Sequence, residues 1–291
     1  MSDCKDQVTA GTNAPSEWQS NQNPMLEYYD SDFPSALLSR YPENFDATTV
    51  SQGLAHDVAR YLEIAARENG EILELCCGTG RVAIPLALQG SSIAAVDFSD
   101  ALLETLRENI ERVAPDAGRR IEIIHQDVTG LDLEKRQFKL AIMAFNSLLC
   151  IPDFAAQRKA LASAARHLVK GGLLVLDLIN PLSLAREGNP IPTPFFTRRH
   201  PRTGRRYTRF AMLSPFDAAH VQRLHGWYDE YGDDGVIRRR PYETLWRPIH
   251  RFEIELMLEV AGFAIEGIDG GHQHEVYSPA SPRMFVSARK R

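Results

Sequence analysis

Short apolar runs alternate with helical stretches between residues 72 and 178, and this rhythm limits the possible folds more than any other feature of the sequence. Strict alternation is typical of a parallel sheet, because parallel strands need crossover connections whose helices cover both faces. The pattern therefore predicts a doubly wound α/β fold. The expected strands are 72–75, 93–96, 121–124, 140–144 and 173–178, and the expected helices between them are 81–88, 101–113 and 154–168.

The rhythm breaks after Asn180-Pro181. Residues 195–246 contain aromatic, β-branched and charged residues around the turn signals Thr203-Gly204 and Gly232-Asp-Asp-Gly235, which favours antiparallel hairpins. We therefore expect an antiparallel β insertion after the fifth strand. The first pattern then returns, with an expected helix at 251–261 and expected strands at 263–268 and 284–288.

The composition suits a soluble globular protein: 44% of the 291 residues are hydrophobic, with 33 Lys and Arg against 38 Asp and Glu. This charge balance gives no general attraction to nucleic-acid backbones. The four cysteines have no metal-ligand spacing, so we expect no disulfide framework, and a reducing cytoplasm fits. Because we find neither an export signal nor an apolar run of about 18 residues, we expect a cytoplasmic protein that does not enter a membrane.

We divide the chain into three parts on this pattern. Residues 1–24 are rich in small polar residues and poor in large apolar ones, which predicts a flexible arm. Residues 25–182 and 250–291 are expected to form the α/β domain. Residues 183–249 are expected to form an inserted β lid that acts as a substrate subdomain.

The first predicted strand ends in Glu74-Leu-Cys-Cys-Gly-Thr-Gly-Arg81, directly before a helix. Gly78 and Gly80 would let a ligand approach the backbone, and the helix N-terminus supplies free N–H groups. Together with Ala83 they also satisfy the G-x-G-x-x-[GA] spacing of dinucleotide enzymes. The loop alone therefore admits NAD as well as other adenosine ligands.

Two carboxylates follow the next two strands. Asp97 lies 19 residues beyond Gly78, where a carboxylate can accept hydrogen bonds from both hydroxyls of a ribose. Its alternative role is a helix N-cap, which Ser99 or Asp100 could also fill. Asp127 could accept a hydrogen bond from an adenine amino group, with a plain turn aspartate as the alternative. Together the carboxylates favour an adenosine ligand.

The run Leu73-Glu-Leu-Cys-Cys-Gly-Thr-Gly-Arg-Val82, followed by Ala95-Val-Asp-Phe-Ser99 and Gln126-Asp127, resembles the class I S-adenosylmethionine-dependent methyltransferases. The resemblance covers residues 25–182 and 250–291, and it extends to the closing helix, strand and antiparallel final strand of that family. It implies a seven-stranded, mostly parallel, doubly wound α/β sheet with an antiparallel last strand and helices on both faces. It also implies S-adenosyl-L-methionine as the cofactor.

The same resemblance implies roles for individual residues. Glu74 would orient the methionine ammonium, and Gly78 would approach the ligand. Asp97 would hold the ribose, and Asp127 would contact the adenine. Cys76 replaces the usual first glycine of the family motif, and we interpret it as a packing residue. The expected cofactor-binding residues are Tyr28, Glu74, Cys76, Gly78, Gly80, Arg81, Asp97, Phe98, Asp127, Val128, Phe145 and Asn146.

The fourth strand ends in Ala144-Phe-Asn-Ser-Leu148, at the edge where ligands of parallel sheets bind. It has neither the [DN]-P-P-[YFW] tetrapeptide of base-methylating enzymes nor the carboxylate of metal-dependent catechol methyltransferases, so we expect no nucleic-acid substrate and no metal. Phe145 and Asn146 are expected to line the cofactor pocket, with a turn Asn as the alternative. Asn180 is expected to face the substrate, with a pre-proline turn residue as the alternative.

The small-molecule branch of the family, including glycine and amino-sugar N-methyltransferases, often has an aromatic N-terminal segment over the cofactor and a β insertion after the fifth strand. This chain is similar in both respects, and Tyr28 and Tyr29 are the candidates for the cap, with core packing as the alternative. A nearby base would help to remove the acceptor's proton. The histidine candidates are His225, His250, His272 and His274, and the expected catalytic residues are Tyr29, His225 and Asn180.

Residues 191–210 contain six arginines and no acidic residue, and Arg238-Arg239-Arg240 follow later. A solvated hairpin face explains them; an anionic substrate is the sharper hypothesis, and RNA is a lesser one. We expect a monomer or homodimer that methylates a small-molecule partner such as a natural-product intermediate, with nitrogen favoured over oxygen or carbon by resemblance alone. An NAD-dependent oxidoreductase and a non-catalytic adenosine-binding protein are the alternatives.

Overall fold

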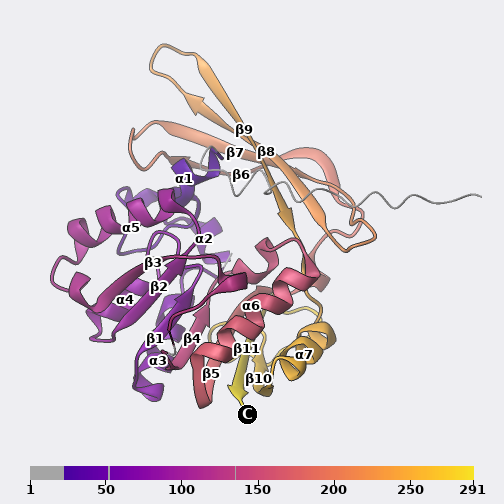
Figure 1. The fold of residues 1–291 in the computed structure, drawn as a ribbon. Coiled ribbons are helices and arrows are strands. Elements are labelled where there is room, and N and C mark those ends of the chain that lie inside the picture. Colours follow the sequence, from indigo (N-terminus) through magenta and orange to yellow (C-terminus); the bar gives the residue numbers. More distant parts are fainter. Residues whose placement is uncertain (1–22, 52, 135) are drawn as a thin grey trace, which may run out of the picture.

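A computed structural model describes residues 23–51, 53–134 and 136–291. The arm predicted at 1–24 falls almost entirely outside these described residues. The described chain forms a large sheet flanked by helices and a separate smaller sheet, with helix α1 (Met25–Asp32) beside the smaller one (Figure 1).

The main sheet has seven strands in the order β10-β11-β5-β4-β1-β2-β3. Its neighbours pair in parallel except around β11, which runs antiparallel to both β5 and β10. The predicted fold class is therefore confirmed. The strand order changes direction between β1 and β4, and ligands of open α/β sheets bind at such switch points. The strands are β1 (Ile72–Leu75), β2 (Ile93–Asp97), β3 (Ile121–His125), β4 (Phe138–Met143), β5 (Leu168–Ile179), β10 (Phe263–Asp269) and β11 (Arg283–Lys290).

Helices cover both faces of this sheet because successive strand residues point to opposite sides. The face of the sheet that carries the Ile72 side chain packs against α3, α4 and α5. The opposite face, which carries the Leu73 side chain, packs against α6 and α7. Ser99 and Asp153 begin α5 and α6 by accepting hydrogen bonds from backbone N–H groups of the first turn. The helices are α2 (Ala47–Ser51), α3 (Asp57–Glu68), α4 (Ala83–Leu88), α5 (Asp100–Val113), α6 (Phe154–His167) and α7 (Arg251–Val260).

The four-stranded sheet is antiparallel throughout, in the order β6-β7-β8-β9. Its inner face carries Tyr207, Tyr228 and Tyr242, which form a core with Met25 and Tyr28 of α1. The N-terminal helix therefore provides the apolar partner that this sheet would otherwise lack. The strands are β6 (Asn189–Arg199), β7 (Arg206–Leu213), β8 (Gln222–Tyr231) and β9 (Ile237–Trp246).

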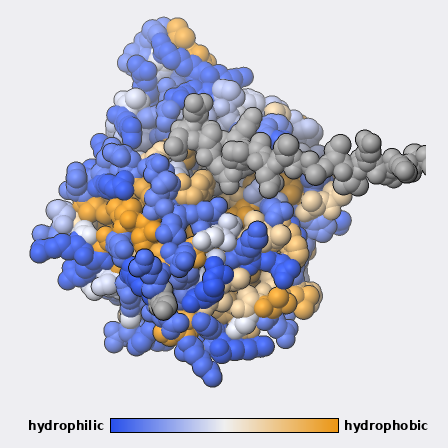
Figure 2. Space-filling model, in the orientation of Figure 1, coloured by the Kyte–Doolittle hydropathy of each residue, from blue (hydrophilic) through white to orange (hydrophobic). Residues whose placement is uncertain are grey.

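The surface in Figure 2 is mostly hydrophilic, with apolar side chains at the tip of the β8–β9 hairpin and over α7. Val236 and Ile237 are exposed at the tip, and Phe252, Leu256 and Val260 are exposed along α7. Within the described residues, every helix is too short or too polar to cross a membrane.

Candidate active site

The loop between β1 and α4 has the backbone of a ligand-binding turn. Cys76, Gly78 and Gly80 all have positive φ, at 61°, 56° and 88°. A side chain on Gly80 would collide with Leu106 of α5, so this glycine allows the helix to pack against the loop. A Cβ on Gly78 would instead lie 3.1 Å from the hydroxyl of Tyr29. Gly78 thus faces α1, whereas Gly80 faces the core.

Asp97 ties this loop to the end of β2. One carboxylate oxygen accepts the backbone N–H of Gly78 at 2.9 Å, and the other accepts the N–H of Ser99 at 2.9 Å. Burial raises the pKa of Asp97, while these N–H groups act in the opposite direction. Because each oxygen has a second lone pair, the carboxylate can still accept hydroxyl donors. This geometry fits a ribose.

Glu74 is buried beneath the loop, with 2% of its surface exposed. Its Oε2 has no hydrogen-bond partner among the described residues. Desolvation raises the pKa of Glu74 to about 8, against the nearby positive charge of Arg81. A buried carboxylate oxygen is seldom left unpaired, and a cationic donor would supply the missing bond. The residues present therefore fit S-adenosylmethionine, whose ammonium Glu74 would face and whose ribose hydroxyls Asp97 would accept.

The two candidate tyrosines lie on different faces of α1. The Tyr29 ring lies against Gly78, and burial together with the Asp97 carboxylate raises the pKa of its hydroxyl. Tyr28 stacks on Tyr228, with ring centroids 3.8 Å apart, and its hydroxyl donates to Glu230 at 2.6 Å. Tyr29 is thus placed at the glycine loop. Tyr28 belongs to the core of the four-stranded sheet, and we withdraw it as a cofactor contact.

Arg81, expected at the cofactor, is occupied by another partner. Its guanidinium donates two hydrogen bonds to Asp57 of α3, at 2.9 and 2.5 Å, and both groups are buried. The guanidinium also lies 5.5 Å from the ring centroid of Phe145. Arg81 therefore fixes α3 to the glycine loop and supports the wall of the site, and it keeps no fork for a ligand carboxylate.

A second buried network, absent from the sequence predictions, centres on Asp177 of β5. Arg283 donates to Asp177 through Nε at 2.9 Å and Nη2 at 2.6 Å. His272 lies 3.0 Å from the carboxylate, and the Tyr61 hydroxyl donates to it at 3.1 Å. Arg283 and His272 hold the pKa of Asp177 well below its usual range despite burial. The sequence did contain a signal for this network, because Asp177 is the one carboxylate inside the apolar run 173–178 and a buried carboxylate needs partners.

The end of β4 turns sharply beside this network. Phe145 and Asn146 have φ of 37° and 68°. The N–H of Asn146 donates to the Asp177 carbonyl at 2.7 Å, and its side-chain oxygen accepts the N–H of Ile179 at 2.7 Å. Phe145 packs edge-on against the ring of Phe33, and Phe33 in turn packs against the ring of Tyr29. Asn146 thus joins the end of β4 to β5, and the Phe145 ring contacts the aromatic residues of the N-terminal segment through Phe33.

Asn180, expected to face the substrate, instead holds the chain before β11. Its amide nitrogen donates to the carbonyls of Ser281 at 2.9 Å and Pro279 at 3.2 Å, while its oxygen accepts the N–H of Leu182 at 3.2 Å. The side chain is fully buried. The alternative role of a structural turn residue explains these contacts, so we withdraw Asn180 as a catalytic residue.

The predicted adenine end lies at the edge of β3. Asp127 is exposed, and its carboxylate accepts the N–H of Thr129 at 2.8 Å in the following turn. Phe98, half-buried, directly follows Asp97. The Val128 side chain is buried in the main core, so a ligand would meet its backbone only. The structure therefore shows Asp127 as a turn residue, and its contact with adenine stays a prediction.

The proposed base His225 lies on the wrong face of its strand. It is three residues before Tyr228 on β8, and alternate strand residues face opposite sides, so His225 points away from α1. There it pairs with Glu243 at 2.9 Å. His272 is bound to Asp177, and His274 lies 3.2 Å from Glu63. We therefore withdraw His225 as the base.

The arginines of the four-stranded sheet are largely paired within the chain. Arg209 contacts buried Asp32 at 3.0 Å, and Arg198 contacts Asp46 at 2.9 Å. The guanidinium groups of these two arginines are therefore bound to carboxylates of the chain itself, whereas the anionic-substrate hypothesis needs guanidinium groups that are open to a ligand. The other pairs among the arginines of residues 191–210 and 238–240 are Arg199 with Glu43, Arg202 with Glu108, Arg238 with Asp234, Arg239 with Asp229 and Arg240 with Glu27.

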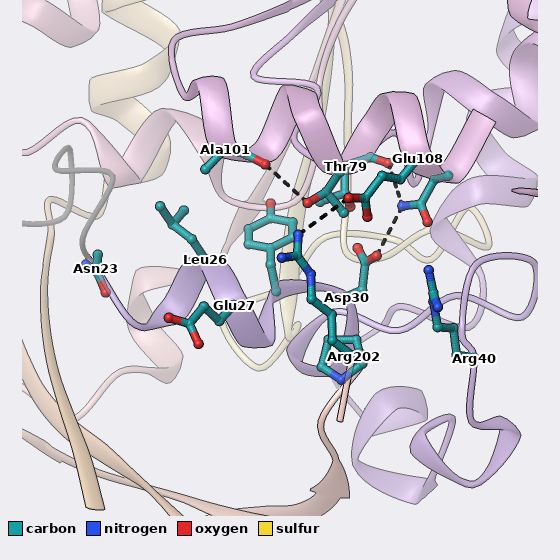
Figure 3. Close-up of a pocket in the computed structure, with 13 residues that line it drawn as sticks. Asn23, Leu26, Glu27, Asp30, Arg40, Thr79, Ala101, Glu108 and Arg202 are labelled. Carbon is teal, nitrogen blue, oxygen red and sulfur yellow. Dashed lines mark hydrogen bonds and ion pairs between the residues drawn. The ribbon is translucent and has the colours of Figure 1, made fainter. Parts of the chain in front are cut away.

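Figure 3 shows a polar cavity of about 130 Å³ between α1, α5 and the turn after β6. Asp30, Thr79, Glu108 and Arg202 are among its lining residues, and Tyr29 forms part of its wall. Small-molecule sites usually enclose at least roughly 300 Å³. The lining does not include Gly78 or Asp97, so this cavity lies beside the candidate cofactor site and is too small to be it. The described residues hold no cluster of three or more side chains suited to a metal ion.

Comparisons with known proteins agree with this geometry. Residues 72–172 match the model of the methyltransferase domain family. The cypemycin N-terminal methyltransferase of a Streptomyces species is 25% identical, over 74% of this chain and 81% of its own length.

Solved structures share the fold. CalS10, an amino pentose methyltransferase of Micromonospora echinaspora, superposes with a TM-score of 0.65 at 20% identity, over 86% of this chain and 98% of its own. The sugar N-methyltransferase KedS8 of a Streptoalloteichus species gives 0.64 at 19% identity, over 81% and 87%. The domain match over residues 72–172, the sheet order and the carboxylates at the glycine loop agree with an S-adenosylmethionine-dependent methyltransferase.

Proposed function

We propose that this methyltransferase acts on a small molecule and transfers the methyl group to a nitrogen atom, with oxygen and carbon acceptors as the alternatives. Support for a nitrogen acceptor comes from relatives, because the cypemycin enzyme is named an N-terminal methyltransferase and KedS8 a sugar N-methyltransferase. The observation in this chain that carries the cofactor assignment is the unpaired Glu74 oxygen beneath a loop bound to Asp97.

We assign a role in cofactor binding to the residues that converge on the glycine loop. Asp97 would accept the ribose hydroxyls, Glu74 would receive the ammonium, and Tyr29 would cover the face of Gly78. Asp127 remains the proposed adenine contact. We also propose that residues 183–249 form the substrate-side lid and that the protein is cytoplasmic, as the three free cysteines of the described residues suggest.

When bound, S-adenosylmethionine supplies an electrophilic methyl group whose bond to sulfur breaks as the acceptor's lone pair bonds to the methyl carbon, leaving S-adenosylhomocysteine. The protein's part is to align the two reactants and exclude water, which can supply most of the rate. A neutral amine needs no strong base for this step; the methylated nitrogen then releases its proton to water. This agrees with the placement of His225 away from the loop.

The first experiment is a calorimetric titration of the purified chain with S-adenosylmethionine, S-adenosylhomocysteine and NADH. We expect micromolar binding of the two sulfur ligands and none of NADH. Asp97→Ala should weaken the binding of both by at least about 1.5 kcal/mol, or more than tenfold, because a charge-assisted hydrogen bond to the ribose is lost. Exposed Asp116→Ala removes the same charge away from the loop and should leave affinity unchanged. Binding of NADH alone would refute the proposal.

The acceptor is found by incubating the chain with methyl-labelled S-adenosylmethionine and separate panels of amino sugars, amino acids, phenols and enolisable carbonyl compounds. We expect label to enter the amines. Label in phenols or carbon acids alone would replace the nitrogen acceptor by the oxygen or carbon alternative while keeping the cofactor assignment.

A further inference from the structure

Helix α1 presents one face to each half of the molecule. Tyr28 and Asp32 are four residues apart and so share a face, which is buried in the four-stranded sheet. Tyr29 and Phe33 form the next such pair, with ring centroids 4.9 Å apart, and they point toward Gly78 and Phe145. A rotation or shift of this helix would therefore move the cap and the contacts with the sheet together.

The face toward the sheet is held mainly by the carboxylate of Asp32, which is 1% exposed. The hydroxyls of Tyr207 and Tyr228 donate to its two oxygens at 2.9 and 2.6 Å. Arg209 adds an ion pair at 3.0 Å and is itself fixed by a hydrogen bond to Tyr242 at 2.7 Å. Strands β7 and β8 thus contact one side chain of α1, and β9 supports this contact through Arg209.

The end of the same helix is held by β6. Arg198 donates through Nη1 to the carbonyls of Ser31 and Asp32, at 2.8 and 2.9 Å. Its other nitrogens pair with Asp46, so the guanidinium cannot follow the helix if α1 turns. A cation at the last carbonyls of a helix is also electrostatically favourable. The position and the rotation of α1 are both defined by the four-stranded sheet.

Packing alone does not require a carboxylate here. Burying a charge in a protein core is expensive, and replacing a buried ion pair by apolar residues is often neutral or stabilising. A carboxylate fixes the orientation of the helix that carries it, because each of its oxygens must lie close to a particular donor. Because Asp32 and Tyr29 belong to the same helix, the orientation that Asp32 fixes also determines where the Tyr29 side chain points.

We propose that Asp32 is a positioning residue for the cofactor site: the four-stranded sheet grips its carboxylate and thereby sets where Tyr29 lies over Gly78. Asp32 does not contact the glycine loop and acts only through α1. The inference rests on the proposed function, since it takes Gly78 and Asp97 as the border of the cofactor. It implies that the four-stranded sheet influences cofactor affinity without contacting the cofactor.

The test is a double-mutant cycle with Asp32→Asn, Tyr29→Ala and the two combined, measured as the Kd for S-adenosylhomocysteine by calorimetry. We expect at least fivefold weaker binding for each single variant. The combined variant should bind within twofold of Tyr29→Ala, because Asp32 has no effect once Tyr29 is gone. The control is Asp229→Asn, which breaks the pair with Arg239 on the other face of β8 and should leave the Kd unchanged.

An unchanged Kd for a folded Asp32→Asn chain would overturn the inference, and so would multiplication of the two single effects in the combined variant. Tighter binding would also overturn it, because Tyr29 would then obstruct the site. If Asp32→Asn does not fold, Tyr207→Phe with Tyr228→Phe removes the same hydrogen bonds and keeps the charge pair, and the same criteria apply. A wild-type chain that binds no S-adenosylhomocysteine would refute the proposed function, whereas normal wild-type binding with unaffected variants would refute only this inference.

Discussion

Two carboxylates in different halves of the molecule have similar partners and opposite electrostatics. Asp177 in the main sheet and Asp32 under the four-stranded sheet are both buried, and each meets an arginine and at least one tyrosine hydroxyl. Yet the pKa of Asp177 is lowered and that of Asp32 is raised. Arg283 and His272 together outweigh desolvation at Asp177. At Asp32 desolvation outweighs the opposing effects of Arg209, Arg198 and the two tyrosine hydroxyls.

The difference has a thermodynamic meaning. A lowered pKa means that ionised Asp177 stabilises the fold at pH values above that of an ordinary aspartate, and that this contribution is lost as the pH falls through the folded value. A raised pKa means that Asp32 gives the opposite trend, with stability falling as the pH rises from the ordinary value through the folded one. Ionised Asp177 therefore stabilises the fold, whereas burial opposes the ionisation of Asp32.

The largest expected effect comes from removing Asp177. Asp177→Ala should destabilise the chain by about 3–5 kcal/mol, because Arg283 would be left buried without its counter-charge. The measurement is urea denaturation at pH 7. Asp32→Ala also leaves Arg209 without its counter-charge, but it should lose less, because the pKa of Asp32 shows that its charge is costly to bury. A larger loss for Asp32→Ala than for Asp177→Ala would contradict the comparison.

Glu74 extends the comparison to a buried carboxylate without a partner. Its pKa of about 8 lies above the ordinary 4.5, so the folded chain keeps a proton that the unfolded chain has released, and stability should fall between these pH values. Glu74→Gln removes this dependence and should stabilise the chain by about 3 kcal/mol at pH 7. Thermal unfolding at pH 5, 7 and 9 checks it. Equal pH slopes for variant and wild type would show that Glu74 is ionised in the fold, and weaker S-adenosylhomocysteine binding should accompany the gain.

The smallest effects should come from single tyrosine hydroxyls. Tyr61→Phe and Tyr207→Phe each remove one hydrogen bond to a carboxylate, worth about 1.5 kcal/mol. The loss for Tyr207→Phe should be larger at pH 8 than at pH 5, because burial raises the pKa of Asp32 above the ordinary aspartate value. The loss for Tyr61→Phe should be the same at both, because Asp177 stays ionised. Thermal unfolding of both variants at the two pH values is the measurement, and identical pH behaviour would remove the distinction.

The sequence predicted the main sheet well because its strands and helices are defined by local periodicity. It also located the glycine loop, where the hydrogen bond from the Gly78 N–H to Asp97 joins two segments that the motif spacing had linked. The predictions failed where a role depends on the direction of a side chain. Tyr28 and Tyr29 are adjacent, and only the phase of α1, which was not predicted as a helix, distinguishes them.

Long-range pairing was the other source of error. Asp57, Asp177 and Arg283 were missed because their partners lie 24 and 106 residues away. The arginines of residues 191–210 have no acidic neighbour in sequence, so an external anion was a reasonable expectation. In the fold, Asp32 and Asp46 reach them from the N-terminal segment. Periodicity and motif spacing contain no information about ion pairs between residues that are distant in the sequence.

The place of β11 between β5 and β10 has a consequence for biosynthesis. Asp177 is made 106 residues before Arg283, which is its strongest partner. At roughly 5–20 residues per second, the ribosome delays that partner by about 5 to 20 seconds. During this interval β5 is an open edge strand whose Asp177 carboxylate has Tyr61 as a partner but lacks His272 and Arg283. The nascent chain therefore has a hydrophilic group at the edge most exposed to aggregation, until the antiparallel strand arrives and closes it.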